Sequence, residues 1–136
     1  MDNLDARSVF FVRDAERSLR FYTEMLGFSL DWKHEERGRA FVVQVSLQGF
    51  PLILNQIEPW TESRAGHGRV FIAIYTEQME WFRRHVEEKR IEIAVLHWGN
   101  PTLAIRDLDE NELFVWLPEG EIASFEAKSQ AHSEAN

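Results

Sequence analysis

Hydrophobic and polar positions follow the same order twice along this chain. A short apolar run at 8–13 (SVFFVR) leads into a helical spacing of apolar residues over 15–26. A second apolar run at 69–75 (RVFIAIY) leads into another helical pattern over 77–89. Several strand-like runs follow each helix. A repeat of this kind decides the fold before any motif is considered. It predicts an α+β domain of two β-α-β-β-β modules with a concave groove between their sheets.

Both predicted helices have boundary signals. Asp14 is suited to cap the first helix, and Gly27 is suited to end it. Thr76 is the corresponding cap candidate for the second helix. Inward-facing stripes at helical spacing support both helices: Leu19, Tyr22 and Leu26 in the first, and Met79, Phe82 and Val86 in the second.

Alternating runs after each helix predict the remaining strands. They lie at 28–34, 39–47 and 52–56 in the first module, and at 91–98, 102–107 and 112–118 in the second. The modules therefore cover about 7–56 and 69–118, and a polar linker at 57–68 joins them. Residues 1–118 are expected to form one domain. The polar tail at 119–136 is expected to be frayed helix or disorder.

Strand alternation divides the strand residues between two faces. One face is purely aliphatic and is expected to pack under the helices. The other mixes aromatic side chains with a few polar ones, as ligand clefts do. A dimer interface would give the same mixture, and ordinary core packing would account for many single aromatics. The residues predicted to line the groove by parity are Phe11, Gln44, Asn55, Arg69, Phe71, Phe114 and Trp116, with Trp32 and Trp98 at strand ends as lids.

Composition narrows the function classes. An apolar fraction of 44% and a charged fraction of 28% are typical of a soluble globular domain. No apolar run is long enough to span a membrane, and the absence of cysteine excludes disulfides and thiolate metal sites. A cytoplasmic location is expected. The net charge of −8 argues against nucleic acid and mildly favours cationic small molecules.

Two segments resemble a known family. The segment VRDAERSLRFYTEMLGF at 12–28 resembles the opening module of the glyoxalase/bleomycin-resistance/dioxygenase family, which has the vicinal oxygen chelate fold. The turn DLDEN followed by ELFV at 107–115 is similar to the closing signature of that family. Leu108 and Glu110 replace the usual proline and glycine, so Glu110 or Asn111 is expected to adopt a left-handed conformation. The resemblance implies the fold but says little about activity.

The resemblance also implies four metal-ligand positions in the metal enzymes of the family. These positions fall on Arg7, Asn55, Arg69 and Phe114. Arginine cannot ligate a cation, phenylalanine has no donor atom, and asparagine is a weak ligand. His67 shares the strand parity of Arg69, but one histidine does not make a site. We therefore expect no metal and no other cofactor.

Without the metal ligands, the sequence resembles the metal-free branch of the family. Its bleomycin-resistance-like members hold ligands in aromatic grooves shared across a homodimer. The resemblance thus implies a metal-independent, antibiotic-resistance type of binding protein that sequesters a partly aromatic ligand. Gln44 and Asn55 would orient the ligand. The alternative is a glyoxalase-like lyase or dioxygenase with a metal site that the sequence does not reveal.

The charge of the ligand stays open at the level of sequence. Arg7 and Arg69 occupy matching positions in the two modules and would suit a carboxylate or phosphate. An anionic ligand would conflict with the cationic preference that the acidic net charge favours. The alternative is that both arginines lie at the rim and face water.

Overall fold

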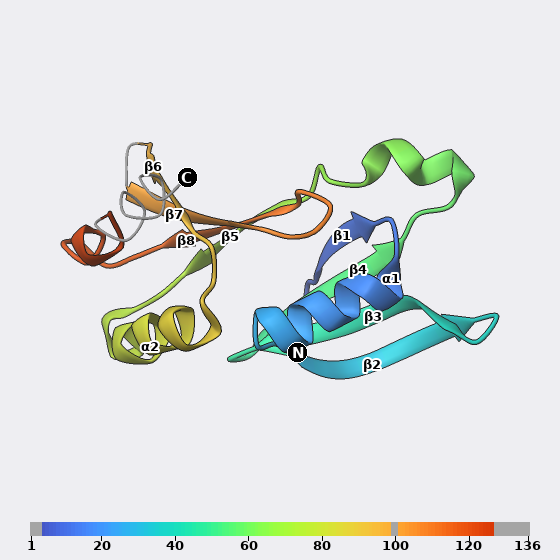
Figure 1. Ribbon diagram of the computed structural model, residues 1–136, viewed down its shortest axis with the longest axis horizontal. Coiled ribbons are helices and arrows are strands. Elements are labelled where there is room, and N and C mark those ends of the chain that lie inside the picture. The colour runs from blue at the N-terminus through green and yellow to red at the C-terminus, as the bar shows by residue number, and fades with distance from the viewer. Residues whose placement is uncertain (1–3, 99–100, 127–136) are drawn as a thin grey trace. The chain divides into compact units, whose positions relative to one another are not determined.

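The computed structural model describes residues 4–98 and 101–126, which form two compact units. Among the described residues, unit 1 consists of 4–68 together with 107–111, and unit 2 of 69–98, 101–106 and 112–126. Each unit contains a four-stranded mixed sheet and one main α-helix (Figure 1). The predicted α+β class with two β-α-β-β-β modules is confirmed. The prediction that residues 1–118 form a single domain stays a prediction.

In unit 1 the strand order is β1-β4-β3-β2, with β1 and β4 parallel and the other neighbours antiparallel. Helix α1 packs against β3 and β4 (Figure 1). The elements are β1 (Ser8–Val12), α1 (Ala15–Arg20), a π-helical turn (Phe21–Met25), β2 (Ser29–Glu36), β3 (Arg39–Leu47), β4 (Phe50–Gln56) and a 3₁₀ helix (Pro59–Arg64) in the linker.

The first helix begins as predicted and then widens. The Asp14 carboxylate accepts a hydrogen bond from the Arg17 N–H, and Gly27 adopts a left-handed conformation with φ of 79°. The single helix predicted over 15–26 is instead an α-helix followed by a π-helical turn. The Thr23 hydroxyl donates to the Leu19 carbonyl at 2.8 Å and so competes for the acceptor that a continuous α-helix would use.

Two tight hairpins set the register of the first sheet. Arg37 and Gly38 have positive φ values of 55° and 75°, and Gln48 and Gly49 have values of 49° and 82°. Two consecutive left-handed residues match the twist of a hairpin. Because the second turn needs only two residues, β4 begins at Phe50, earlier than the predicted start at residue 52.

In unit 2 the strand order is β5-β8-β7-β6, again with one parallel pair, β5 and β8. The elements are β5 (Arg69–Ala73), a 3₁₀ turn (Thr76–Gln78), α2 (Met79–Lys89), β6 (Ala94–His97), β7 (Pro101–Arg106) and β8 (Glu112–Trp116). No helix of the described residues is long and apolar enough to cross a membrane.

Two boundaries of unit 2 differ from the prediction. Thr76 does not cap α2, because it lies inside the 3₁₀ turn, where the Gln78 side chain accepts from the Tyr75 N–H. Strand β6 starts at Ala94 rather than at residue 91, because Arg90 ends the helix in a left-handed conformation with φ of 52°.

Each unit buries the aliphatic face of its sheet. Buried residues of unit 1 are Phe10, Val12, Tyr22, Val43, Val45, Leu52 and Leu54. Buried residues of unit 2 are Met79, Phe82, Val86, Leu103, Leu113, Val115 and Phe125. The predicted division of the strand residues into an aliphatic and a mixed face is thus confirmed at these positions.

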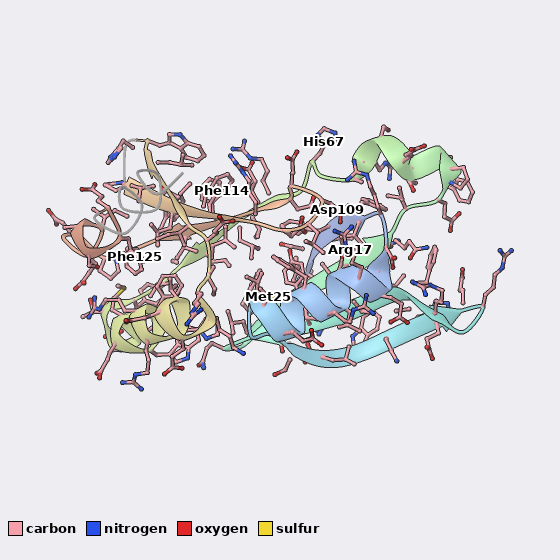
Figure 2. All side chains as sticks on the ribbon, viewed as in Figure 1. Arg17, Met25, His67, Asp109, Phe114 and Phe125 are labelled. Carbon is pink, nitrogen blue, oxygen red and sulfur yellow. The ribbon has the colours of Figure 1, made fainter. Side chains whose placement is uncertain are left out.

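The C-terminal segment, predicted from residue 119 onward to be frayed helix or disorder, includes a short helix at 123–126. Phe125 is only 2% exposed, and its ring centroid lies 5.8 Å from that of Phe82 on α2 (Figure 2). Arg83 of α2 also forms an ion pair with Glu121. The polar composition of the segment from residue 119 gave no indication that Phe125 would anchor it to α2. Residues 127–136 of the predicted tail lie outside the described residues.

The turn between β7 and β8 belongs to unit 1 and is held there by buried polar contacts. The Tyr22 hydroxyl donates to Asp107 at 2.9 Å, and Arg13 pairs with Asp109 at 2.9 Å. The Asn111 amide donates to the Phe11 carbonyl and accepts from the Gly68 N–H. The alternate residues Asp107, Asp109 and Asn111 of the DLDEN segment are therefore the ones that attach this turn to the rest of unit 1.

Burial changes the acid–base behaviour of this turn. It raises the pKa of the Asp107 carboxyl, although hydrogen bonds from Asn111 and Tyr22 oppose the rise. Burial and the neighbouring Asp107 charge raise the pKa of the Tyr22 phenol well above its usual value. Glu110, not Asn111, takes the left-handed conformation, with φ of 74°.

Candidate ligand-binding site

The four aromatic residues predicted in the second module come together on one face of the second sheet. Phe71 on β5 is the register partner of Phe114 on β8, Trp116 ends β8, and Trp98 follows β6. The ring centroid of Phe71 lies 4.9 Å from that of Phe114 and 4.8 Å from that of Trp116. The ring centroids of Trp98 and Phe114 are also 4.9 Å apart. We call Phe71, Trp98, Phe114 and Trp116 the aromatic platform.

The platform is half open to solvent. Phe71, Trp98 and Trp116 are 45%, 43% and 44% exposed, whereas Phe114 is fully covered. Figure 2 shows Phe114 on the second sheet. Phe114 was predicted to line the groove. In unit 2 it supports the exposed rings from beneath, and those rings provide the surface that a ligand can touch.

Arg69 lies across the edge of the platform. Its guanidinium carbon is 4.7 Å from the Phe114 ring centroid and 5.7 Å from that of Trp98. Cation–π contact therefore holds the arginine on the aromatic face. Its Nε also pairs with Glu112 at 3.3 Å, and Arg106 pairs with the same carboxylate at 3.4 Å. The sequence left open whether Arg69 faces a groove or water; it lies on the platform and is partly exposed.

In unit 1 the predicted polar residue Gln44 is part of a closed hydrogen-bond chain. Its Oε1 accepts from Arg7 at 2.9 Å, and its Nε2 donates to Asp31 at 2.8 Å. Asp31 also accepts from the Ser46 hydroxyl at 2.9 Å. The amide of Gln44 is thus hydrogen-bonded within the protein at both its oxygen and its nitrogen.

Sequence reasoning missed Asp31 because strict alternation along the strand would place Asp31 and Trp32 on opposite faces of the sheet. The register shifts between Leu30 and Trp32, where β2 pairs with β3, and Trp32 pairs with Gln44. Such a bulge brings two successive residues to the same side of a strand. Asp31 consequently reaches the side chains of Gln44 and Ser46.

The other predicted residues of unit 1 are more dispersed. Phe11 and Asn55 are register partners on β1 and β4, and the Asn55 amide donates to the Gln56 carbonyl at 2.9 Å. The Arg64 guanidinium lies over the Phe11 ring at 5.5 Å. Arg64, which the sequence did not single out, takes the place over an aromatic ring in unit 1 that Arg69 takes in unit 2. Trp32 is half-exposed on the edge strand β2.

The residues at the inherited metal positions do not fit a metal ion. Arg7 is bonded to Gln44, Arg69 is stacked on aromatic rings, and Phe114 is buried without a donor atom. Two guanidinium groups would repel a cation, and Asn55 offers one weak ligand. Within residues 4–98 and 101–126, no three His, Asp or Glu side chains gather as a group that could hold a metal.

Comparison with known families agrees with the fold. The model of the glyoxalase/bleomycin resistance protein/dioxygenase superfamily matches residues 6–113, which is most of the chain. This chain belongs to that superfamily. The resemblance carried by the VRDAERSLRFYTEMLGF and DLDEN segments is therefore confirmed, as is the vicinal oxygen chelate fold. No curated protein matches the chain.

Several solved structures are similar in fold to this chain. The bleomycin-binding protein from bleomycin-producing Streptomyces verticillus, complexed with copper(II)-bleomycin, has a TM-score of 0.61 at 19% identity, covering 88% of this chain and 99% of that chain. The antibiotic-binding protein TnmS3 from Streptomyces sp. CB03234 has a TM-score of 0.56 at 18% identity, covering 88% and 100%. A lactoylglutathione lyase from Agrobacterium tumefaciens has a TM-score of 0.58 at 16% identity, covering 91% and 98%. At these identities the similarity shows the fold alone, and both binding proteins and an enzyme share it.

Proposed function

We propose that this superfamily member reversibly binds a small, partly aromatic ligand without a metal, in the manner of bleomycin-resistance proteins. The observation that carries the proposal is the half-exposed aromatic platform of unit 2. The Phe71 ring lies next to those of both Trp98 and Trp116, and all three rings are more than two-fifths exposed. They form an apolar patch of the kind that marks a binding surface. Aromatic faces hold planar ligands by stacking, with about 0.5–1.5 kcal/mol per ring pair beyond area burial.

The residues at the inherited metal positions support binding rather than metal chemistry. Phe114 supports the exposed rings of the platform, Arg69 lies on the platform, and Arg7 donates a hydrogen bond to Gln44. Two of the structural relatives are described as binding an antibiotic or bleomycin, which makes an antibiotic-like ligand a reasonable first candidate. We also retain Phe11, Trp32, Gln44 and Asn55 of unit 1 as proposed ligand-binding residues.

The proposal includes a homodimer in the cytoplasm, as the resemblance to single-chain bleomycin-resistance-like proteins implies. Sedimentation velocity at micromolar concentration should show a dimer of the 16.0 kDa chain. A species that stays monomeric at 100 μM would contradict this part of the proposal. In that case the platform of unit 2 would bind its ligand within a single chain.

The test of binding uses a panel of bleomycin-type glycopeptides, planar aromatics and small aromatic carboxylates. Because Trp98 and Trp116 belong to the platform, binding should quench tryptophan fluorescence and raise the melting temperature. Trp116→Ala should weaken binding of any hit about tenfold. Trp60→Ala, which removes a 76% exposed tryptophan from the linker, is the matched control and should leave binding unchanged.

Two results would overturn the proposal. Equal effects of the two tryptophan substitutions on a confirmed ligand would show that the platform is not the site. Stoichiometric zinc, nickel, iron or manganese in protein dialysed without chelator, lost together with an activity on chelation, would favour the glyoxalase-like lyase or dioxygenase alternative.

A further inference from the structure

We propose that the ligand of the aromatic platform is an anion, a planar aromatic acid whose carboxylate or similar group is bound at Arg69. This inference rests on the proposed binding function and specifies the ligand class that the sequence left open. It runs against the net charge of −8, which by itself favours cations. The argument uses the residues of unit 2 alone.

The strand register arranges the platform face in rows. Arg69, Glu112 and Arg106 are successive register partners across β5, β8 and β7. The next row on the same face contains Phe71, Phe114 and Ala104, and the row after it contains Ala73, Trp116 and Thr102. One row is therefore charged, and the two rows beyond it hold the rings.

The charged row has an excess of positive charge. Two guanidinium groups share the single carboxylate of Glu112, at 3.3 and 3.4 Å. Among the residues of β5–β8, Arg69, Arg106 and Glu112 are the charged side chains that parity places on this face. Within these strands the sum is one positive charge. Glu112 is the less exposed partner, so the guanidinium groups present that charge to solvent. Glu92, outside the strands, lines a surface hollow together with Arg106, Ala94 and Ala104 and so adds a carboxylate near Arg106. The cation that remains on the aromatic rings is Arg69.

The position of Arg69 makes this charge available to a bound ring. Its guanidinium lies against Phe114 and Trp98, within the cluster that contains the exposed Phe71. A guanidinium that is held against aromatic rings loses less freedom when it binds a carboxylate. The contacts thus pre-position a cation at the edge of an apolar surface.

The spacing of the rows indicates the size of the acid. Adjacent rows on one face are separated by two residues, or about 7 Å along a strand. A ring that covers Phe71 is therefore about 7 Å from the charged row, which is roughly the length of a fused bicyclic ring system. A cationic ligand in the same place would bring its charge beside Arg69 and lose affinity.

The test compares three probes of one shape by isothermal titration calorimetry: 2-naphthoate, 2-naphthamide and 2-naphthylmethylammonium. The anion should bind about tenfold more tightly than the neutral amide, and the ammonium most weakly. The preference for the anion should shrink as salt is raised, because an exposed cation is screened. Melting temperatures of all variants verify that they are folded.

Two substitutions should move the anion preference in opposite directions. Arg69→Gln should lower the ratio of naphthoate to naphthamide affinity to about one, with little change in the amide. Glu112→Gln should raise the ratio, because it removes the carboxylate that neutralises part of the charged row. Arg84→Gln on the exposed side of α2 is the matched control and should leave the ratio unchanged.

Each outcome separates the inference from the binding proposal. Equal affinity for acid and amide, with both weakened by Trp116→Ala, would retain the binding proposal and overturn the anion inference. Tightest binding of the ammonium would also overturn it. Absence of binding by all three probes at millimolar concentration would overturn the inference and the platform proposal together.

Discussion

The two sheets are built on the same plan but present different chemistry on their mixed faces. In unit 1 the central polar groups satisfy each other, since Gln44 joins Arg7 to Asp31. In unit 2 the corresponding face has half-exposed rings and an arginine lying on them. A hydrogen-bonded network that is complete within the protein gains little from a ligand, whereas exposed apolar surface gains from being covered. For this reason we propose that unit 2 provides most of the binding energy.

The largest effect should come from removing the support of the platform. Phe114 is fully buried, so Phe114→Ala should lower the free energy of unfolding by about 3–5 kcal/mol and also weaken 2-naphthoate binding. Urea denaturation measures the first quantity and calorimetry the second. Phe71→Ala removes a half-exposed ring and should cost clearly less stability. Equal losses of unfolding free energy for the two variants would contradict the claim that Phe114 is buried and Phe71 half-exposed.

A smaller effect should come from opening the polar chain of unit 1. Gln44→Ala removes the partner of both Arg7 and Asp31, and should cost about 1–2 kcal/mol of stability. Affinity for 2-naphthoate should change by less than threefold if the network is mainly structural. Lys33→Ala on the exposed β2 is the control for stability. A tenfold loss of affinity with unchanged stability would instead make Gln44 an orienting ligand contact, as the sequence suggested.

The smallest effect concerns the pH dependence of the turn held in unit 1. Burial raises the pKa of Asp107 in the folded state above its unfolded value of about 3.9, so the folded protein holds the proton more tightly. This group therefore contributes stability at low pH that is lost as the pH rises from about 4 through the folded pKa.

Urea midpoints of wild type and Asp107→Asn, measured from pH 4 to pH 7, should reveal this contribution. The substitution has a constant cost from altered hydrogen bonds with Tyr22 and Asn111. On top of it, the difference in stability between wild type and variant should be larger at pH 4 than at pH 7. A difference that grows with rising pH would mean that the hydrogen bonds outweigh burial and lower the pKa.

Periodicity was sufficient to predict both modules, most strand positions and the two faces of each sheet. It worked because the aliphatic stripes, such as Leu52 and Leu54, are buried with period two. Local backbone irregularities escaped it: the bulge that brings Asp31 beside Gln44, and the π-helical turn after Arg20. Neither has a composition signal, because each depends on hydrogen bonds formed after folding.

The candidate site was predictable in part for the same reason. Parity placed Phe71, Phe114 and Trp116 on one face, and the structure brings them into contact. Parity could not show that Arg69 and Trp98 cover Phe114, nor that Arg64 lies over Phe11, because those contacts depend on side-chain direction and on residues outside the strands. The same limit applies to Phe125, whose burial needed the position of α2.

The central claim is that a ligand binds on the platform of unit 2, and ¹⁹F NMR of protein labelled with 5-fluorotryptophan tests it most directly. The chain has five tryptophans, which single Trp→Phe variants would assign. Saturation with 2-naphthoate should shift the Trp98 and Trp116 resonances strongly and leave those of Trp60 and Trp81 in place. Unchanged Trp98 and Trp116 resonances at saturation, with the shifts at other tryptophans, would contradict the account.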